Sequence, residues 1–151
     1  MVNVIEMKEV KEGIGRITRN IEGVLNRFQE IEFAYLFGSF LERKVFNDID
    51  VALYVSKGFS PYERMKFSLK IGRELEKAIL PRYKFDVTIL NYAPMLLQYE
   101  VIKTGKVVFS EDEVNRIRYE AQVLSGYLDY KETSDWLDRV FLASSSHILE
   151  A

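Results

Sequence analysis

Two aspartates stand two positions apart inside an apolar run. Asp48 and Asp50 open the segment DIDVALYV, residues 48–55, in which alternation places both carboxylates on the same face of a strand. Ionised carboxylates in an apolar setting lose hydration, and two of them side by side also repel each other. A divalent cation removes both costs, and Mg²⁺ prefers one or two carboxylates together with substrate phosphates. The pair therefore predicts a metal site that acts on phosphates.

A third acid stands alone in another apolar segment. Asp86 lies in KFDVTIL, residues 84–90, which is also expected to be a strand. Three such carboxylates can hold two metal ions about 4 Å apart, an arrangement that clamps the attacking and leaving oxygens of an in-line displacement at phosphorus. We predict Asp48, Asp50 and Asp86 as metal ligands and catalytic residues.

A Gly-Ser pair suits the phosphate end of the same chemistry. Gly38 and Ser39 directly follow an expected strand, where free backbone N–H groups and a serine hydroxyl can face phosphates. Glycine allows a close approach of the backbone. Arg43 and Lys44, between this turn and Asp48, add positive charge for a triphosphate. These four residues are the predicted nucleotide-binding residues.

In order and context, these residues resemble a known family. Gly38-Ser39, then Asp48-Ile49-Asp50, then the lone strand aspartate Asp86 are similar to the nucleotidyltransferase superfamily of DNA polymerase beta type, specifically its minimal nucleotidyltransferase (MNT) branch. Residues 99–113 and 127–142 are similar to the C-terminal half of MNT antitoxins that pair with HEPN toxins. The resemblance spans about residues 31–142.

The resemblance implies roles and partners. Gly38 and Ser39 would hold the nucleotide phosphates, Asp48 and Asp50 would bind two Mg²⁺ ions, and Asp86 would complete the metal site and help to deprotonate the acceptor hydroxyl. The implied activity is transfer of AMP from ATP to a tyrosine of a HEPN ribonuclease toxin, which inactivates the toxin. Whether the antitoxin forms homo- or hetero-oligomers stays open.

Two departures from the family keep alternatives open. Eight residues, 40–47, separate Ser39 from Asp48, where the family usually has ten, and Asn47 stands where serine is common. One alternative is a non-catalytic antitoxin that neutralises its partner by binding alone. Another is a nucleotidyltransferase with a small-molecule acceptor, which ranks last because only about 40 residues follow Phe109, too few for a further substrate domain.

Composition narrows the class of protein. The 151 residues, 48% of them hydrophobic, match one domain with one substantial core. The 21 basic and 23 acidic residues nearly balance, so we expect no direct nucleic-acid binding and no membrane attachment. Cysteine is absent, and neither a signal peptide nor a membrane span is evident, which favours the cytoplasm.

Apolar spacing predicts the elements that position the site. Strands are expected at 31–37, 48–55, 83–90 and 106–109, and helices at 14–28, from Pro61 to before Pro81, and at 93–104. Ser60 and Glu63 form a capping-box pattern at the start of the second of these helices. Its apolar stripe is expected to comprise Tyr62, Met65, Leu69, Leu75 and Ile79.

Two further helices are expected at the C-terminus. One follows a second capping-box pattern at Ser110 and Glu113, with apolar residues at helical spacing: Val114, Ile117, Ala121, Leu124 and Leu128. The last begins near Ser134, and its Trp136 and Phe141 belong either to the core or to an exposed patch for a partner. The fold class is thus α+β, a mixed β-sheet covered by helices, as a single domain 1–151 with a core at about 10–109 and a helical extension at about 110–149.

Overall fold

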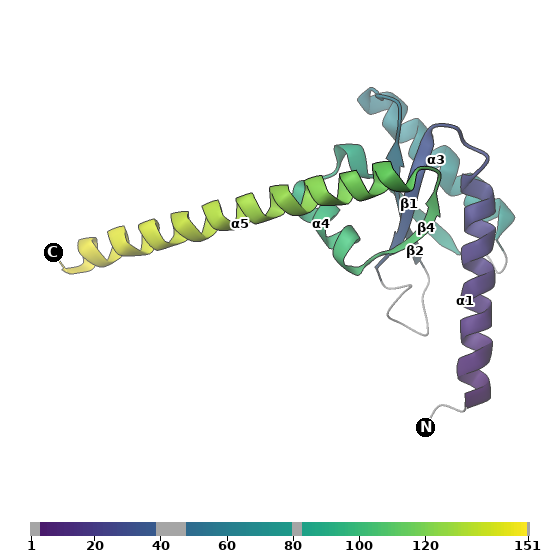
Figure 1. Cartoon of the computed structure of the whole chain (residues 1–151), viewed down its shortest axis with the longest axis horizontal. Coiled ribbons are helices and arrows are strands. Elements are labelled where there is room, and N and C mark those ends of the chain that lie inside the picture. The colour runs from purple at the N-terminus through teal and green to yellow at the C-terminus, as the bar shows by residue number, and fades with distance from the viewer. Residues whose placement is uncertain (1–3, 39–47, 80–82, 151) are drawn as a thin grey trace.

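The structure contains a four-stranded mixed sheet and helices on both of its faces (Figure 1). The computed structural model describes residues 4–38, 48–79 and 83–150, with side chains between residues 13 and 143 of these ranges. The strands are β1 (Ile31–Phe37), β2 (Asp48–Val55), β3 (Lys84–Ile89) and β4 (Lys106–Ser110), in the order β3-β2-β1-β4. β1 pairs antiparallel with β2 and β4, whereas β2 and β3 run parallel. The predicted α+β class is confirmed.

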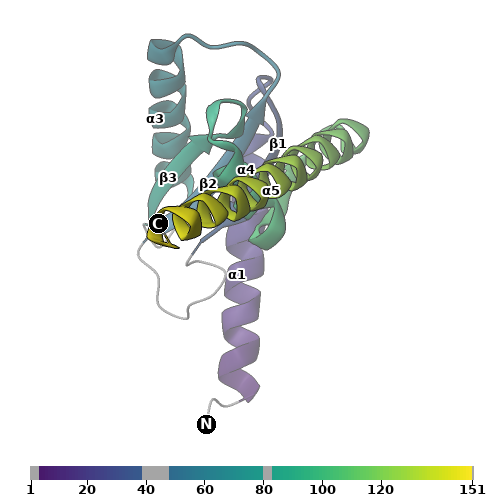
Figure 2. The same cartoon turned by 90° about the vertical axis from the view of Figure 1, so that its left-hand side faces the viewer.

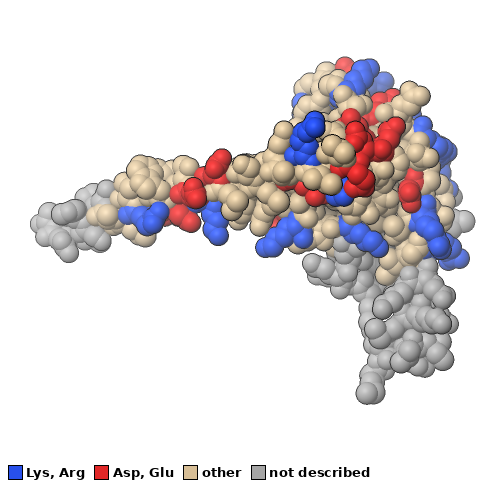
Figure 3. All heavy atoms as spheres, in the orientation of Figure 1, with Lys and Arg blue, Asp and Glu red and all other residues tan. Residues whose placement is uncertain are grey.

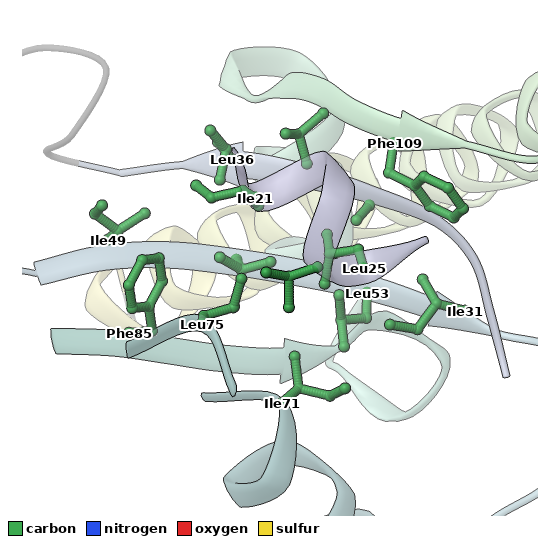
Figure 4. Packing of buried hydrophobic residues seen from close by; sticks show 14 of the residues in the cluster. Ile21, Leu25, Ile31, Leu36, Ile49, Leu53, Ile71, Leu75, Phe85 and Phe109 are labelled. Atoms are coloured by element: carbon green, nitrogen blue, oxygen red, sulfur yellow. The ribbon is translucent and has the colours of Figure 1, made fainter. Parts of the chain in front are cut away.

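Helices α1 (Val4–Leu25) and α3 (Pro61–Ala78) cover one face of the sheet. Ile21 and Leu25 of α1 and Ile71 and Leu75 of α3 are fully buried against strand residues such as Leu53 (Figure 4). α3 provides the crossover connection that two parallel strands require. Burial of its apolar face therefore fixes β3 beside β2.

Helices α4 (Met95–Thr104) and α5 (Glu113–Glu150) lie on the opposite face, over an aromatic cluster. Phe33 and Tyr54 stack with their ring centroids 4.5 Å apart, and Tyr119 of α5 packs against both rings. The buried Tyr35 hydroxyl donates a 2.7 Å hydrogen bond to Glu120 on α5. These contacts anchor the first turns of α5 to β1 and β2.

Strand predictions from alternation are confirmed. β1 and β2 begin and end at the predicted residues, β3 is one residue shorter than predicted at each end, and β4 is one residue longer at its C-terminal end. In β2, Ile49, Val51 and Leu53 belong to the core under α1 and α3, while Ala52 and Tyr54 belong to the aromatic cluster. Asp48 and Asp50 therefore share the face that α4 and α5 cover.

Helix α3 buries only part of the predicted stripe, since Leu75 and Ile79 are fully buried and the other three members are exposed. Ser60 caps it as expected, since its hydroxyl accepts a hydrogen bond from the Glu63 backbone N–H. The buried residues are Phe67, Ile71, Gly72 and Leu75. Three members of the predicted stripe are more than half exposed: Tyr62, Met65 and Leu69. α3 carries apolar residues on two faces, and spacing alone did not distinguish the inner one.

The C-terminus forms one helix where two were predicted. α5 is continuous from Glu113 to Glu150, so the helix start near Ser134 was wrong. Its N-terminus is capped by Asp112, whose Oδ1 accepts from the Asn115 backbone N–H, and not by Ser110. Tyr119 and Val123 are buried, whereas Val114, Ile117, Leu124 and Leu128 of the expected stripe are exposed. The first predicted helix, 14–28, instead begins at Val4 and ends at Leu25.

Beyond the sheet, α5 leaves the body of the protein (Figures 1 and 2). The last contacts with α4 are a stack of Tyr127 on Tyr99, with ring centroids 3.6 Å apart, and a close approach of Gly126 to Met95. From Leu128 to Ala143, every side chain except Ser134 is exposed. None of the helices in the described part of the chain is both long and apolar enough to cross a membrane.

The two faces of α3 give a direct test of the core. We expect Leu75→Ala to lower the free energy of unfolding by about 2–5 kcal/mol, because it leaves a cavity at a fully buried site. Leu69→Ala, at a position 53% exposed on the same helix, should change it by about 0.5 kcal/mol or less. Urea denaturation of both variants checks this. Equal losses would contradict the assignment of the inner face.

Candidate active site

Three strands bring the predicted acids to one end of the sheet. Asp50 lies opposite Phe37 on β1 and beside Asp86 on the parallel strand β3. Asp48 lies beside Lys84 in the same register. Residues side by side in a parallel pair point to the same face of the sheet. The structure therefore places Asp50 and Asp86 next to each other. Asp48 lies two residues before Asp50, at the start of β2.

Gly38 ends β1 in a conformation that demands glycine. Its φ is +81°, which side chains of L-residues rarely tolerate. A Cβ atom at this position would also overlap Oδ2 of Asp50. The sequence predicts for this glycine only a close approach of the backbone to phosphates. The geometry shows a further requirement, because the missing side chain makes room for the Asp50 carboxylate.

The surroundings of Asp50 disfavour its charge. Burial, followed by the nearby charges of Asp86 and Asp48, raises the pKa of the Asp50 carboxyl above its ordinary value. Asp86 is exposed and Asp50 is half-buried. A carboxylate that lacks hydration and faces two acids is stabilised by a cation. A cation beside Asp50 would therefore offset the cost of its charge.

The described side chains offer a pair of adjacent carboxylates for this cation. Within residues 13–38, 48–79 and 83–143, no three acidic or histidine side chains come close enough to hold a metal ion. Asp50 and Asp86 remain adjacent through the β2–β3 register. Two carboxylates meet the protein's share of a Mg²⁺ site, since Mg²⁺ takes its other ligands from water and phosphates. The donor set thus fits Mg²⁺ bound with a nucleotide.

The structure describes only some of the remaining predicted site residues. Ser39, Arg43 and Lys44 lie outside the described residues, so their predicted contacts with a nucleotide stay predictions. Lys84, which the register sets beside Asp48, is exposed. Because it stands two positions before Asp86, it shares the face of that residue on the strand. Phe37 was not predicted as part of the site. It lies opposite Asp50 and packs on the aromatic cluster, and only the strand register reveals it.

A hollow elsewhere on the surface lies away from the acids. It measures about 700 Å³ and lies along α3, where four cations line it together with Phe59 and Phe67: Lys66, Lys70, Arg73 and Lys77. α3 covers the face of the sheet opposite to Asp50. The chemistry of the carboxylates, and not the size of this hollow, therefore locates the candidate active site.

The pattern of a glycine turn followed by carboxylates on neighbouring strands agrees with a family match. The family model described as "Polymerase beta, Nucleotidyltransferase" matches residues 19–114, which hold the whole sheet and all three acids. The chain belongs to this family. This nucleotidyltransferase also has relatives among solved structures, although no curated protein matches its sequence significantly.

Three solved structures illustrate the likeness of the nucleotidyltransferase to known folds. A chain of the MntA-HepT toxin-antitoxin complex is 19% identical with a TM-score of 0.61, covering 84% of this chain and 98% of its own. A chain of a toxin-antitoxin structure with AMP-PNP is 21% identical with a TM-score of 0.63, covering 82% and 98%. A third similar chain comes from the complex of the tri-AMPylated Shewanella oneidensis HEPN toxin with MNT antitoxin. It is 20% identical with a TM-score of 0.61, and the match covers 84% of this chain and 98% of that chain. At such identities the likeness shows the fold alone.

Substitution of Gly38 tests the glycine requirement. We expect Gly38→Ala to destabilise the nucleotidyltransferase by about 1–3 kcal/mol, because the new Cβ meets Asp50 and the positive φ is strained. Gly58→Ala is the matched control, since a Cβ there meets nothing within 4 Å, and it should be near neutral. Urea denaturation measures both. Equal stability of the two variants would show that Gly38 does not constrain Asp50.

The raised pKa of Asp50 predicts a pH-dependent cost to stability. Because the pKa is higher in the folded than in the unfolded protein, ionised Asp50 destabilises the fold at neutral pH, and this cost disappears as the pH falls through the folded-state pKa. We expect metal-free Asp50→Asn to melt at a higher temperature than the parent at pH 7, and the difference to vanish towards pH 4.

The measurement is thermal unfolding in EDTA across this pH range. Glu22→Gln, which neutralises an exposed acid on α1, serves as the control and should show no such trend. A melting temperature of Asp50→Asn at or below that of the parent at pH 7 would contradict the raised pKa.

Proposed function

We propose that this nucleotidyltransferase is an antitoxin that transfers AMP from ATP, with Mg²⁺, to a tyrosine hydroxyl of a HEPN ribonuclease toxin. The observation that carries the proposal is the adjacency of Asp50 and Asp86 across β2 and β3, beside the turn at Gly38. This arrangement supplies carboxylates for a metal and a backbone turn for phosphates at one end of the sheet. It meets the needs of nucleotidyl transfer.

Structural neighbours support the choice of partner and nucleotide. They include chains from toxin-antitoxin complexes, one with AMP-PNP and one with a tri-AMPylated HEPN toxin. The match covers 98% of each neighbouring chain, so nearly the whole of each neighbour has a counterpart here. ATP as the nucleotide donor and a HEPN protein as the acceptor follow from this likeness as proposals.

In the proposed reaction, each acid has a part suited to its setting. Mg²⁺, when bound, neutralises the triphosphate and polarises the phosphorus that is attacked. The half-buried Asp50 would hold this ion next to Asp86, and Asp48 would serve a second ion. The exposed Asp86 can accept the proton of the acceptor hydroxyl as it attacks the α-phosphorus of ATP. Pyrophosphate then leaves in line with the attack.

Binding without catalysis is the second candidate. It is favoured by the long exposed part of α5, which offers a protein partner a surface apart from the acids (Figure 1). The shortened segment between Ser39 and Asp48 also departs from the family pattern. A small-molecule acceptor remains third, because the structural neighbours named above come from toxin-antitoxin complexes.

Removal of the metal ligand separates these candidates. We expect Asp50→Ala to reduce AMP transfer at least about 100-fold, as is typical when a group that stabilises developing charge is lost. The assay incubates the purified protein with ATP, Mg²⁺ and the purified HEPN protein encoded beside it, and reads the mass of the HEPN protein. Each transfer adds one AMP. Glu22→Ala, at an exposed acid on α1, should transfer normally.

Ribonuclease activity of the HEPN protein supplies the second readout. If Asp50→Ala forms the complex but no longer silences the ribonuclease, catalysis is the mechanism of neutralisation. Undiminished silencing by this variant would support neutralisation by binding alone. Undiminished transfer would refute the metal role of Asp50.

A further inference from the structure

The distal arm, which we define as residues 128–143 of α5, exposes an unusual amount of apolar surface. Its exposed large apolar side chains are Leu128, Tyr130, Trp136, Leu137, Val140, Phe141 and Leu142. Phe141 is 73% exposed and Leu142 is 66% exposed. Isolated surface apolar residues are ordinary, but a continuous group on one helix marks an interaction site. In Figure 3 the arm shows uncharged side chains in tan between separate red and blue groups.

The apolar residues at the end of the arm gather on one side of the helix. At about 100° per residue, Trp136, Leu137, Val140 and Phe141 fall within an arc of about 140°, whereas Leu142 lies outside it. The opposite side carries the charged residues Asp135, Asp138 and Arg139. Such a broad apolar arc on a helix is normally buried against other elements.

This arc continues the face with which α5 packs on its own protein. Tyr119 and Val123 are buried in the aromatic cluster, and Tyr127 stacks on Tyr99 of α4. Tyr130, Leu137 and Phe141 follow these residues at helical spacing along the same side. The surface that covers the sheet near Tyr119 therefore extends past the body, where the described residues of the chain leave it exposed.

The charges along the arm select the kind of partner. Four acidic residues, Asp129, Glu132, Asp135 and Asp138, stand against two basic ones, Lys131 and Arg139. The arm is therefore net acidic, which disfavours nucleic acid, an anionic membrane or a second arm of the same charge. A protein with apolar residues flanked by lysine and arginine is complementary to it.

The position of the arm relates it to the active site. Asp50 and Asp86 lie on the face of the sheet that α4 and α5 cover, and the arm stands out from that face (Figures 1 and 2). A protein seated along Leu137 and Phe141 thus lies on the same side of the sheet as the acids.

From these observations we infer that the distal arm is the docking surface for the acceptor protein, whose basic-flanked apolar helices pack on Leu137 and Phe141 and present the acceptor hydroxyl to Asp50 and Asp86. The inference rests on the proposed function for the identity of the acceptor. It adds the surface that selects the acceptor, at a distance from the residues that act on the nucleotide. Helices are the natural occupants, because packing beside a helix buries an apolar stripe along its length.

The test compares Leu137→Glu/Phe141→Glu with the control Arg139→Gln in the full-length protein. Glutamate preserves helix propensity, and all three positions are exposed, so the fold should be retained, as circular dichroism and thermal unfolding verify. The partner is the purified HEPN protein encoded beside the chain. Complex formation is measured by titration calorimetry, AMP transfer by mass spectrometry, and nucleotide binding by titration with AMP-PNP and Mg²⁺.

We expect the double variant to bind the HEPN protein at least about 100-fold more weakly, as befits the loss of two apolar anchors. Transfer at limiting partner concentration should fall in parallel, while AMP-PNP binding stays at the parental level. Arg139→Gln should bind and transfer normally. The combination of lost docking and intact nucleotide binding supports the inference.

Other outcomes overturn it, each in a recognisable way. Normal binding and transfer by the double variant would place docking elsewhere and leave the proposed function standing. If the parent neither binds nor modifies the HEPN protein, the proposed function fails, and the assigned occupant of the arm fails with it. A parental dimer that the double variant abolishes, measured by light scattering, would assign the arm to a second copy of this chain.

Discussion

The parallel pairing of β2 with β3 is the constraint on which the active site depends. It sets Asp50 beside Asp86, two residues that are 36 positions apart in the chain. Parallel neighbours need a crossover, which α3 provides by burying Phe67, Ile71 and Leu75 against the sheet. The core on one face of the sheet therefore fixes the spacing of the acids on the other. The geometry of the candidate active site is therefore a consequence of hydrophobic packing.

The same pairing places Asp50 in a setting that disfavours its charge. Asp50 faces two other acids, and burial raises its pKa further. Gly38 adopts a positive φ and leaves the space that the Asp50 carboxylate occupies. Neither feature stabilises the isolated fold, whereas both suit a cation that bridges protein and nucleotide. Structures tolerate such local strain where binding or catalysis requires it.

Alternation and turn chemistry predict much of this fold, while helical spacing predicts less. The strand limits at Ile31, Phe37, Asp48 and Val55 follow from period-two alternation, which also assigns the face of each aspartate. The predicted stripe of α3 failed at Leu69, because that helix is apolar on two sides and spacing does not reveal which side meets the sheet. Strand order and register, which set Asp86 beside Asp50, are tertiary properties that no single segment encodes.

At the C-terminus, helical spacing also failed to predict the helix boundaries, for a different physical reason. A continuous α5 replaced the two predicted helices because residues 129–134 contain no glycine or proline that would end a helix. The proximal half of the helix packs on its own sheet, and the distal arm leaves it. Trp136 and Phe141 could belong to a core or to an exposed patch by sequence, and the structure exposes both. The apolar side that packs at Tyr119 and Val123 continues along the arm to Leu137 and Phe141, which are exposed. The proposed division of labour follows, with nucleotide chemistry held at the end of the rigid sheet and selection of the acceptor carried by the projecting helix.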